Sequence, residues 1–273
     1  MRPYLSTLTR RPPAAVTGSS RVSGRLLVNV AHRGASAYAP ENTLAAVRKA
    51  IARDADVVEF DVRRTKDGAL VLLHDVTLDR TTDVRRVFPR RAPWRVPDFT
   101  HAELMRLDAG SWKSQEYAGE RIPTLTEALE VLALSRVGAL VELKAPATSR
   151  GIAAAVAAAV HASSTRSTVQ SFDHVAMREL KQVAPYVSVG LLGSPARSLL
   201  PGLADWVDQV NPHHRRVDRA YVEDVHASGM QCVAWTTDRA SAMRRLIRLG
   251  VDGVITNRPD LLHRVRAGRL SRL

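Results

Sequence analysis

Eight ionisable residues stand within or directly after four apolar runs of the sequence, where an ordinary buried strand carries apolar side chains. They are His32, Arg33, Glu59, Asp61, His74, Asp75, Glu142 and Lys144. One such residue alone has a structural explanation, because a single histidine at a strand end is usually hydrogen-bonded and a single glutamate is often half of an ion pair. The whole set, converging on one rim, would leave buried charges without partners unless a cation and an anionic ligand balanced them.

The carboxylates of this set predict a metal site. Glu59, Asp61 and Glu142 supply oxygen ligands, which Ca²⁺ and Mg²⁺ prefer. The sequence has no cluster of cysteines and histidines with zinc-ligand spacing, so zinc is disfavoured. We therefore expect one divalent cation, either Ca²⁺ or Mg²⁺.

The remaining members of the set fit phosphate chemistry. Arg33 and Lys144 are cations of the kind that hold phosphate oxygens. His32 and His74 titrate near neutral pH and form a potential pair of general acid and base. A metal, two phosphate-binding cations and two histidines together indicate hydrolysis of a phosphate ester.

Alternating strand and helix patterns must position these residues. Short β-branched runs span residues 26–34, 57–65, 70–75, 139–144, 167–172, 187–193, 206–212, 232–237 and 252–257. Amphipathic periodicity marks residues 42–52, 125–133, 151–161, 174–183, 219–227 and 239–249. Repeated units of this kind favour an α/β fold, a (β/α)8 TIM barrel, over an open doubly wound sheet. In such a barrel the carboxyl ends of the strands line the active site.

A hairpin accounts for the ninth run. Only residues 66–69 separate the second and third runs, too few for the crossover that parallel neighbours require. The Asp-Gly pair at the centre of this segment is a strong two-residue hairpin turn. A turn centred there places Asp61 opposite His74, and strand alternation adds Glu59 to the same face.

A long insertion follows the hairpin, at about residues 76–123, and contains no clear barrel element. Connections of that length inside a compact domain are usually functional or flexible. Its first half is rich in arginine, which suits either a solvated loop or the attraction of an anionic substrate.

The charge of the chain is concentrated at its ends. The 273 residues carry a formal net charge of +13, but residues 1–40 contain six arginines and no acidic residue, and residues 241–273 contain eight arginines and two aspartates. Residues 1–24 are also rich in Pro, Ser and Thr, which predicts a disordered basic arm before a barrel domain over residues 25–273. A basic chain suggests a polyanionic partner, but this uneven distribution leaves nucleic-acid binding as a minor alternative.

Other global features bound the setting of the protein. At 45% hydrophobic and 25% charged residues, the chain is long enough to bury a large core. A single cysteine, Cys232, excludes an internal disulfide. The sequence has no apolar stretch of about 18 residues and no apolar core of a signal peptide behind its first arginines. We therefore expect a cytoplasmic protein.

Short motifs occur along the chain in a fixed order. They are His32-Arg33-Gly34, Pro40-Glu41-Asn42-Thr43, Glu59-Phe60-Asp61-Val62, Lys66-Asp67-Gly68, His74-Asp75, Leu78-Asp79-Arg80-Thr81-Thr82, Leu107-Asp108-Ala109-Gly110-Ser111-Trp112, Ile122-Pro123-Thr124-Leu125, Val141-Glu142-Leu143-Lys144, Gln170-Ser171-Phe172, Ala234-Trp235-Thr236 and residues 250–259. Over residues 27–265 this series closely resembles the glycerophosphodiester phosphodiesterase family. The sequence departs from the family pattern at residues 83–91, where a short glycine-rich turn is common, and this departure leaves the head-group preference open.

The resemblance implies a TIM barrel and metal-dependent hydrolysis of a glycerophosphodiester to sn-glycerol 3-phosphate and an alcohol. Carried over position by position, it implies the following roles: metal ligands at Glu59, Asp61 and Glu142, general acid and base at His32 and His74, and phosphate binding at Arg33 and Lys144. Trp235 lies near a strand end and is a candidate pocket wall, although a packing role is equally compatible with the sequence.

Two alternatives remain at this point. The first is a lysophospholipase D reaction on the same fold, assisted by an apolar lip around Val87, Phe88 and Trp94. The second is a non-catalytic protein that uses its basic ends to bind nucleic acid or an anionic membrane.

Overall fold

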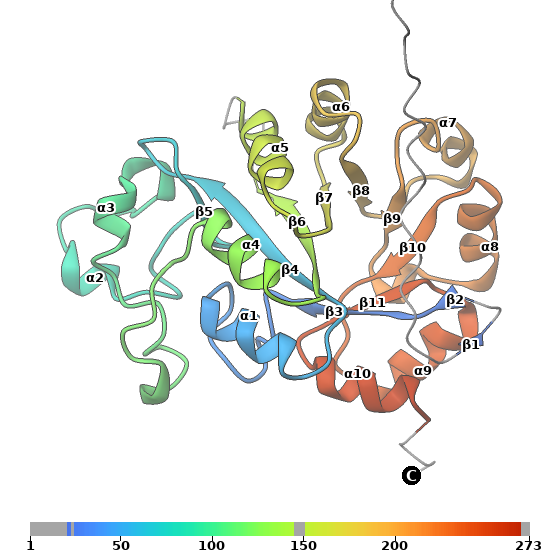
Figure 1. Cartoon of the computed structure of the whole chain (residues 1–273), viewed down its shortest axis with the longest axis horizontal. Coiled ribbons are helices and arrows are strands. Elements are labelled where there is room, and N and C mark those ends of the chain that lie inside the picture. Colours follow the sequence, from blue (N-terminus) through green and yellow to red (C-terminus); the bar gives the residue numbers. More distant parts are fainter. Residues whose placement is uncertain (1–20, 23–24, 145–150, 269–273) are drawn as a thin grey trace, which may run out of the picture.

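The structure, a computed structural model, describes residues 21–22, 25–144 and 151–268. Within these residues eight parallel strands form a closed barrel surrounded by helices (Figure 1). The strands are β3 (Val28–His32), β4 (Val57–Arg64), β6 (Gly138–Leu143), β7 (Ser167–Ser171), β8 (Ser188–Leu192), β9 (Gln209–Asn211), β10 (Gln231–Ala234) and β11 (Gly253–Thr256). Because β3 pairs with both β4 and β11, the sheet closes on itself, which confirms the predicted TIM barrel.

Helices form at all six segments with amphipathic periodicity. They are α1 (Leu44–Ile51), α4 (Leu125–Ala133), α5 (Ile152–Ala162), α6 (His174–Val183), α8 (Arg219–Ala227) and α9 (Ala240–Leu249). The start of α4 shows why the boundaries are sharp: Thr124 and Glu127 form a reciprocal capping box at its first turn. Outside the insertion, two further helices, α7 (Leu200–Leu203) and α10 (Pro259–Arg266), were not predicted from the sequence.

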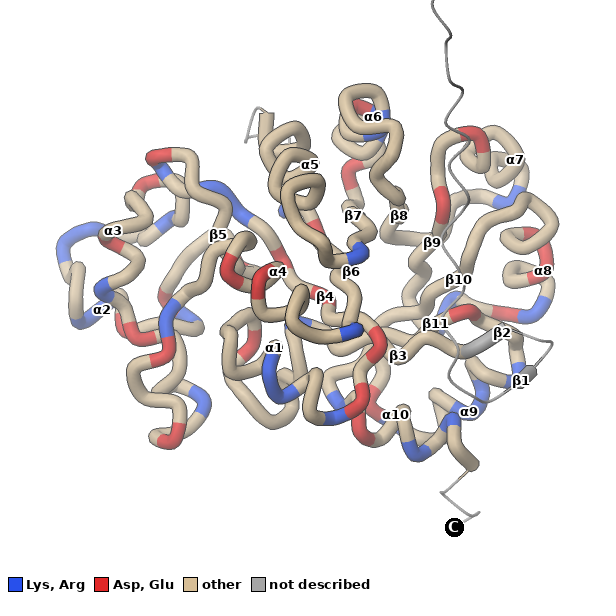
Figure 2. Tube along the Cα trace, viewed as in Figure 1, with Lys and Arg blue, Asp and Glu red and all other residues tan. Residues whose placement is uncertain are grey.

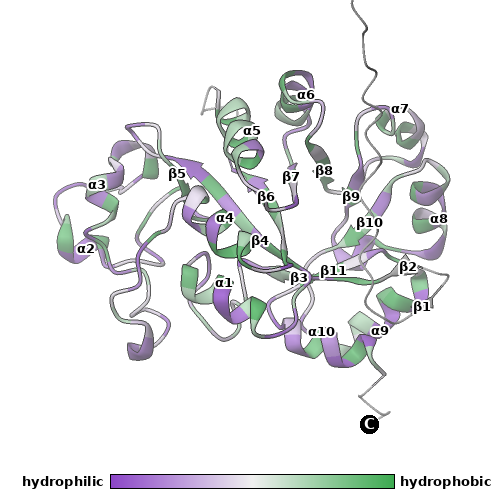
Figure 3. Ribbon diagram, in the orientation of Figure 1, coloured by the Kyte–Doolittle hydropathy of each residue, from purple (hydrophilic) through white to green (hydrophobic). Residues whose placement is uncertain are grey.

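The main core lies between the barrel wall and the helices. On β4 the outward residues Val58, Phe60 and Val62 belong to this core, and each is fully buried. Helix α5 is coloured as hydrophobic over most of its length (Figure 3), and five of its side chains are buried. Burial of apolar surface between the two layers is the main stabilising contribution to such a fold.

The inside of the barrel changes character along its axis. Val30, Leu140, Val233 and Ile255 form a small apolar cluster that fills the interior from four strands. Strand alternation then places polar residues on the same inward face toward the carboxyl ends, such as Glu142 two positions after Leu140. A layer of apolar side chains therefore fills the barrel below its polar carboxyl end.

The hairpin exists, but its predicted register is wrong. Strand β5 (Leu70–Leu72) pairs antiparallel with β4, with Val62 opposite Leu72. Continuing this register, Leu73 N donates to Asp61 O at 3.0 Å, so Asp61 faces Leu73 and not His74. The reason is the turn: Thr65 N donates to Ala69 O, which leaves a three-residue loop that ends in a left-handed Gly68. One extra loop residue shifts every pair by one position.

The insertion is a packed unit and not an open loop. It lies to one side of the barrel (Figure 1, cyan to green) and contains α2 (Val84–Val87), α3 (His101–Leu104) and the 3₁₀ turns η1 (Val96–Asp98) and η2 (Gln115–Tyr117). Its own cluster of buried residues includes Leu78, Phe99 and Leu107. Val87, Phe88 and Trp94 pack against this cluster, so they do not form the free apolar lip that the sequence suggested.

The predicted N-terminal arm falls almost entirely outside the described residues. Its residues 21–22 form β1 (Arg21–Val22), which pairs antiparallel with β2 (Arg25–Leu26). Elsewhere, 3₁₀ turns η4 (Arg197–Leu199) and η5 (His214–Arg216) lie in loops after β8 and β9. Among the helices of the described chain, none is both long and apolar enough to cross a membrane.

Candidate active site

Three carboxylates meet inside the barrel, toward the carboxyl ends of β4 and β6. Glu59 and Asp61 alternate along β4, and Asp61 is in register with Glu142 of β6. One oxygen atom from each of the three residues lies within 4.8 Å of the others. All three residues are buried, and Asp61 has no accessible surface. The fold therefore assembles the carboxylates that the sequence singled out into one cluster.

Burial and mutual repulsion control the charge of this carboxylate cluster. Burial, and then Asp61 and Glu142, raise the pKa of Glu59 well above its usual value. Burial and Asp61 raise the pKa of Glu142 to about 7. Burial also opposes the ionisation of Asp61, but Lys144 and Arg33 outweigh this effect and hold the pKa of Asp61 below its usual value. In the absence of another cation, the cluster therefore retains protons on Glu59 and Glu142 to unusually high pH.

Two cations contact the same cluster. Arg33 Nε lies 3.2 Å from Asp61 Oδ2. Lys144 Nζ lies 3.0 Å from Asp61 Oδ1 and 2.5 Å from Glu142 Oε1. The main-chain N–H of Arg33 also donates to Glu59 Oε2 at 2.8 Å. Arg33 and Lys144 are therefore where the sequence placed them, beside the carboxylates.

The loop after β3 fixes Arg33 through unusual backbone conformations. Arg33 and Asn42 both have positive φ angles, 56° and 58°. Gly34 has a φ of 79°, and a Cβ atom at this position would lie 2.6 Å from the main chain of Ala46 in α1. The Asn42 side chain donates to Asp61 Oδ2 at 2.8 Å and accepts from Asp61 N at 3.1 Å. This loop therefore aligns both the arginine and the central carboxylate.

A relay of hydrogen bonds orients His32 at the end of β3. The ring nitrogen Nδ1 of His32 lies 2.7 Å from Asn257 Oδ1. The amide of Asn257 is itself fixed, because its Nδ2 donates to Asp238 Oδ2 at 2.7 Å and its main-chain N–H donates to Asp238 Oδ1 at 2.8 Å. A carboxylate only accepts, so Asn257 must present its oxygen to His32. His32 therefore carries its proton on Nδ1 and leaves Nε2 free. Burial, and then Arg33, lower the pKa of His32 to about 4.

His74 has a similar partner in the segment after β5. Its Nδ1 lies 2.7 Å from Asp75 Oδ1, so Nε2 again remains free. Arg80 Nε donates to Asp75 Oδ2 at 2.5 Å, and Arg80 also binds both carboxylate oxygens of Glu41, at 2.7 and 3.0 Å. Glu41 Oε1 in turn accepts from Arg33 Nη1 at 2.9 Å. Burial lowers the pKa of His74, and Asp61 partly offsets this effect. His74 is thus connected to the rest of the site, although it is not opposite Asp61.

Trp235 follows β10 and is half-buried at the same end of the barrel. Its ring packs against the interior apolar cluster and meets Phe172 edge to face, with the ring centroids 5.7 Å apart. Its Nε1 donates to Asn211 O at 2.7 Å. These two contacts fix the orientation of the indole, beside Phe172, a residue that is 55% exposed.

Sequence reasoning assigned no role to the residues that hold the two histidines. Glu41, Arg80 and Asn257 were visible only as members of motifs. Asp238 lies two residues beyond the Ala234-Trp235-Thr236 motif and had no signal of its own. A carboxylate shortly after a strand that ends in polar residues is the one pattern that would have drawn attention to it.

The comparison with protein families decides the assignment. The model of the glycerophosphoryl diester phosphodiesterase family matches residues 32–261, which is most of the chain. The chain belongs to this family. It is therefore a phosphodiesterase of the glycerophosphoryl diester class, as the motifs predicted, and the matched residues include both histidines, both cations and the carboxylate cluster.

Individual members of the glycerophosphoryl diester phosphodiesterase family agree. The glycerophosphodiester phosphodiesterase of Caldanaerobacter subterraneus subsp. tengcongensis is 36% identical over 247 residues, covering 88% of this chain and 98% of that protein. The solved structure of an Oleispira antarctica phosphodiesterase in complex with the product sn-glycerol-3-phosphate has a TM-score of 0.80 and 32% identity, covering 89% of this chain and 97% of that one. The glycerophosphodiester phosphodiesterase from Agrobacterium tumefaciens has a TM-score of 0.74 at 29% identity, covering 87% and 99%.

Proposed function

We propose that this protein hydrolyses glycerophosphodiesters to sn-glycerol 3-phosphate and an alcohol, with Glu59, Asp61 and Glu142 holding one divalent cation, Ca²⁺ or Mg²⁺. The buried carboxylate cluster with its two cations carries this proposal. The Oleispira antarctica relative, whose solved structure contains sn-glycerol-3-phosphate, supports the identity of the product.

The residues of the cluster fit a hard divalent cation. Glu59 Oε1 is buried and has no hydrogen-bond partner, which is costly for a carboxylate oxygen that no ion contacts. The three ligands are all carboxylates within reach of one another, the donor set that Ca²⁺ and Mg²⁺ prefer. When bound, such a cation neutralises negative charge on the phosphoryl oxygens and polarises the phosphorus centre.

The charges of the cluster also favour a phosphodiester. Three ionised carboxylates exceed Arg33 and Lys144 by one negative charge, and a divalent cation changes that excess to one positive charge. A phosphodiester carries one negative charge, so its binding completes the balance. Arg33 and Lys144 are placed to hold phosphate oxygens and to stabilise the charge that develops on them in the transition state.

The two histidines supply proton transfer. His32 and His74 each have Nδ1 engaged and Nε2 free. One Nε2 accepts the proton of the attacking hydroxyl while its oxygen bonds to phosphorus. The other histidine, which takes up a proton on its Nε2 before the reaction, donates that proton to the leaving alkoxide as the phosphorus–oxygen bond breaks, so the products leave as a phosphate monoester and a neutral alcohol. We place Trp235 at the wall of the pocket that receives part of the substrate.

The lysophospholipase alternative receives no support from the described residues. Its proposed lip packs into the insertion, as described above. We therefore keep a small water-soluble diester as the proposed substrate.

A product assay tests this proposal. The full chain is incubated with glycerophosphocholine, glycerophosphoethanolamine and glycerophosphoglycerol in the presence of Ca²⁺ or Mg²⁺, and sn-glycerol 3-phosphate is detected enzymatically. We expect release from at least one diester that EDTA abolishes and added metal restores. The proposed substrate class is wrong if no diester yields sn-glycerol 3-phosphate with either metal.

A further inference from the structure

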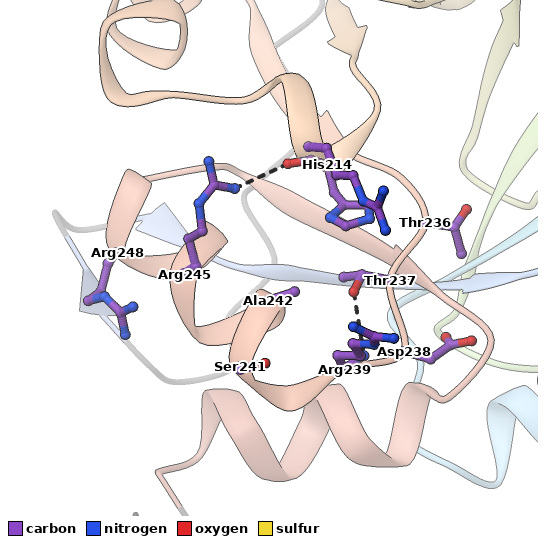
Figure 4. Close-up of a pocket in the computed structure, with 10 residues that line it drawn as sticks. His214, Thr236, Thr237, Asp238, Arg239, Ser241, Ala242, Arg245 and Arg248 are labelled. Carbon is purple, nitrogen blue, oxygen red and sulfur yellow. Dashed lines mark hydrogen bonds between the residues drawn. The ribbon is translucent and has the colours of Figure 1, made fainter.

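A second pocket opens beside the active site, between the loops that follow β9 and β10. Its volume is about 600 Å³, which is within the range of small-molecule sites. Its wall combines η5, the segment after β10 and one side of α9 along most of its length (Figure 4). Four arginines line it: Arg215, Arg239, Arg245 and Arg248. Figure 2 shows that Lys and Arg also recur along α9 and α10.

The positive charge of this arginine pocket is not balanced by acidic side chains. Across the described ranges, no carboxylate lies within ion-pair distance of any of the four guanidinium groups, whereas Arg197, Arg264 and Arg266 are paired with Asp224, Asp260 and Asp56. Arg245 is held by main-chain carbonyls alone, those of His214 and Val217. Carbonyl groups order this guanidinium without cancelling its charge.

The only acidic residue in the lining, Asp238, is occupied elsewhere. Its side chain points away from Arg239, Arg245 and Arg248 (Figure 4). Its Oδ1 accepts from Thr256 and from the main chain of Asn257, and its Oδ2 accepts from the Asn257 side chain. The positive charge of the pocket also acts on His214. Burial lowers the pKa of this histidine, and the neighbouring charges of His213, Arg215, Arg245 and Arg239 lower it further.

Neutral donors complete the lining. Ser241 lies in the first turn of α9, and no side chain caps this helix. Thr236 and Thr237 also line the pocket from the loop after β10, and Thr237 Oγ1 accepts from the main-chain N–H of Arg239 at 3.4 Å (Figure 4). Guanidinium groups, hydroxyls and the start of a helix around one hollow are the set that binds phosphate oxygens.

We propose that the arginine pocket binds the phosphate group of an anionic small molecule, as a second anion site separate from Arg33 and Lys144. Its position adjoins the catalytic residues, because Asp238 lines the pocket and is connected through Asn257 to His32. Two sources share this chemistry: a free phosphate compound, and a terminal phosphate on the head group of a substrate. The link to the head group rests on the proposed function, whereas the anion site itself does not.

A binding experiment tests the site directly. Inorganic phosphate is titrated calorimetrically into the full chain with Mg²⁺, and the number of sites and their affinities are determined. The test variant is Arg239→Gln/Arg248→Gln, because neither side chain makes a hydrogen bond in the described chain. The matched control is Arg244→Gln, on the same helix α9 but outside the pocket lining. We expect two phosphate sites in the wild type and in the control, and a loss of at least about tenfold in affinity at one site in the test variant. Equal binding by all three proteins overturns the proposal.

A kinetic experiment identifies the source of the phosphate. Glycerophosphoglycerol is compared with the same diester carrying a terminal phosphate monoester. If the head group occupies the pocket, the test variant raises KM about tenfold for the phosphorylated diester and leaves KM for the other diester and both kcat values unchanged. If the test variant loses phosphate affinity in calorimetry but its KM for the phosphorylated diester is unchanged, the pocket binds a free phosphate compound. One outcome separates the two proposals. If the wild type cleaves neither diester, and calorimetry still shows one phosphate site fewer in the test variant than in the wild type, the proposed function fails and the anion site stands.

Discussion

His32 and His74 share one arrangement at the level of single atoms. In each ring Nδ1 faces an oxygen acceptor 2.7 Å away, and Nε2 makes no hydrogen bond within the described residues. Their acceptors differ, because His32 faces an amide and His74 faces a carboxylate. The hydrogen bond from Arg80 lowers the pKa of Asp75 to about 2, so this carboxylate is ionised at neutral pH. In the protein without substrate, both imidazoles therefore favour the same neutral tautomer, with the proton on Nδ1.

Replacing His74 by asparagine tests the proton-transfer role. His74→Asn keeps a hydrogen-bonding side chain of similar reach but removes the titrating group. We expect kcat for glycerophosphodiester hydrolysis to fall by roughly 10² to 10⁴, the usual contribution of a general acid or base. Calorimetric metal affinity should remain unchanged, since His74 is not among the proposed ligands. A variant with near-normal kcat would remove His74 from the mechanism.

The tautomer of His32 depends on Asp238, two side chains away. In Asp238→Asn the new amide both donates and accepts, so Asn257 is free to turn its NH₂ group toward His32. We expect nitrogen-15 chemical shifts of His32 to move from the Nδ1–H form toward the Nε2–H form, with a fall in kcat. Asp224→Asn, which changes a surface ion pair with Arg197, is the control. An unchanged His32 spectrum would contradict the relay.

At the level of elements, periodicity predicted most of the barrel. All nine predicted strands and six predicted helices exist, because alternation along strands and a 3.6-residue period along helices reflect burial on one face. The register of the hairpin was wrong because pairing depends on how many residues the turn uses. That number depends on local contacts such as the hydrogen bond from Thr65 Oγ1 to Asp67 Oδ1, which composition does not reveal.

The candidate site likewise contains residues that could be predicted from the sequence and residues that could not. The proposed ligands, cations and histidines were predictable because their polar side chains interrupt apolar runs. Asn257 and Asp238, which lie behind His32, were not predictable, because closure of the barrel brings Asn257 to His32. His32 and Asn257 are 225 positions apart and become neighbours only because β3 pairs with β11.

The loop between β3 and α1 offers a test at this scale. Gly34→Ala places a Cβ atom 2.6 Å from the main chain of Ala46 in a backbone conformation that alanine disfavours. We expect the free energy of unfolding to fall by about 2 to 4 kcal/mol, and the Tm by roughly 5 to 10 °C, with loss of activity as Arg33 shifts. Gly202→Ala in α7 is the control, because no atom lies within 4 Å of its added Cβ. Equal melting temperatures for the two variants would refute the packing argument.

For the whole molecule, the net charge of +13 is a poor guide to function. The carboxylate cluster requires a local balance that the total charge conceals. The arginine pocket accounts for part of the positive charge of residues 241–273, since Arg245 and Arg248 line this pocket.

The pH dependence of stability follows from the carboxylate cluster. The folded-state pKa of Glu142 is about 7 and that of Glu59 is also raised, so the metal-free fold binds these protons more tightly than the unfolded chain does. This contribution to stability is present at low pH and is lost as the pH rises from about 4.5 through about 7. Metal competes with the same protons, so its stabilising effect should increase over that window. We expect the rise in Tm on adding Ca²⁺ or Mg²⁺ to be larger at pH 8 than at pH 5.5 in calorimetry. In Glu59→Gln, the rise in Tm on adding metal at pH 8 should be smaller than in the wild type. An equal rise at both pH values in the wild type would contradict the proposed competition between metal and protons.

The most direct test of the central claim couples metal binding to product formation in one titration. Metal-free protein receives increasing Ca²⁺ or Mg²⁺ while calorimetry reports occupancy and an enzymatic assay reports sn-glycerol 3-phosphate released from a glycerophosphodiester. We predict one metal per chain, rates that rise in proportion to occupancy, and loss of both signals in Glu59→Gln with the fold retained by circular dichroism. Full activity in metal-free protein, or product formation by Glu59→Gln at the wild-type rate, would contradict it.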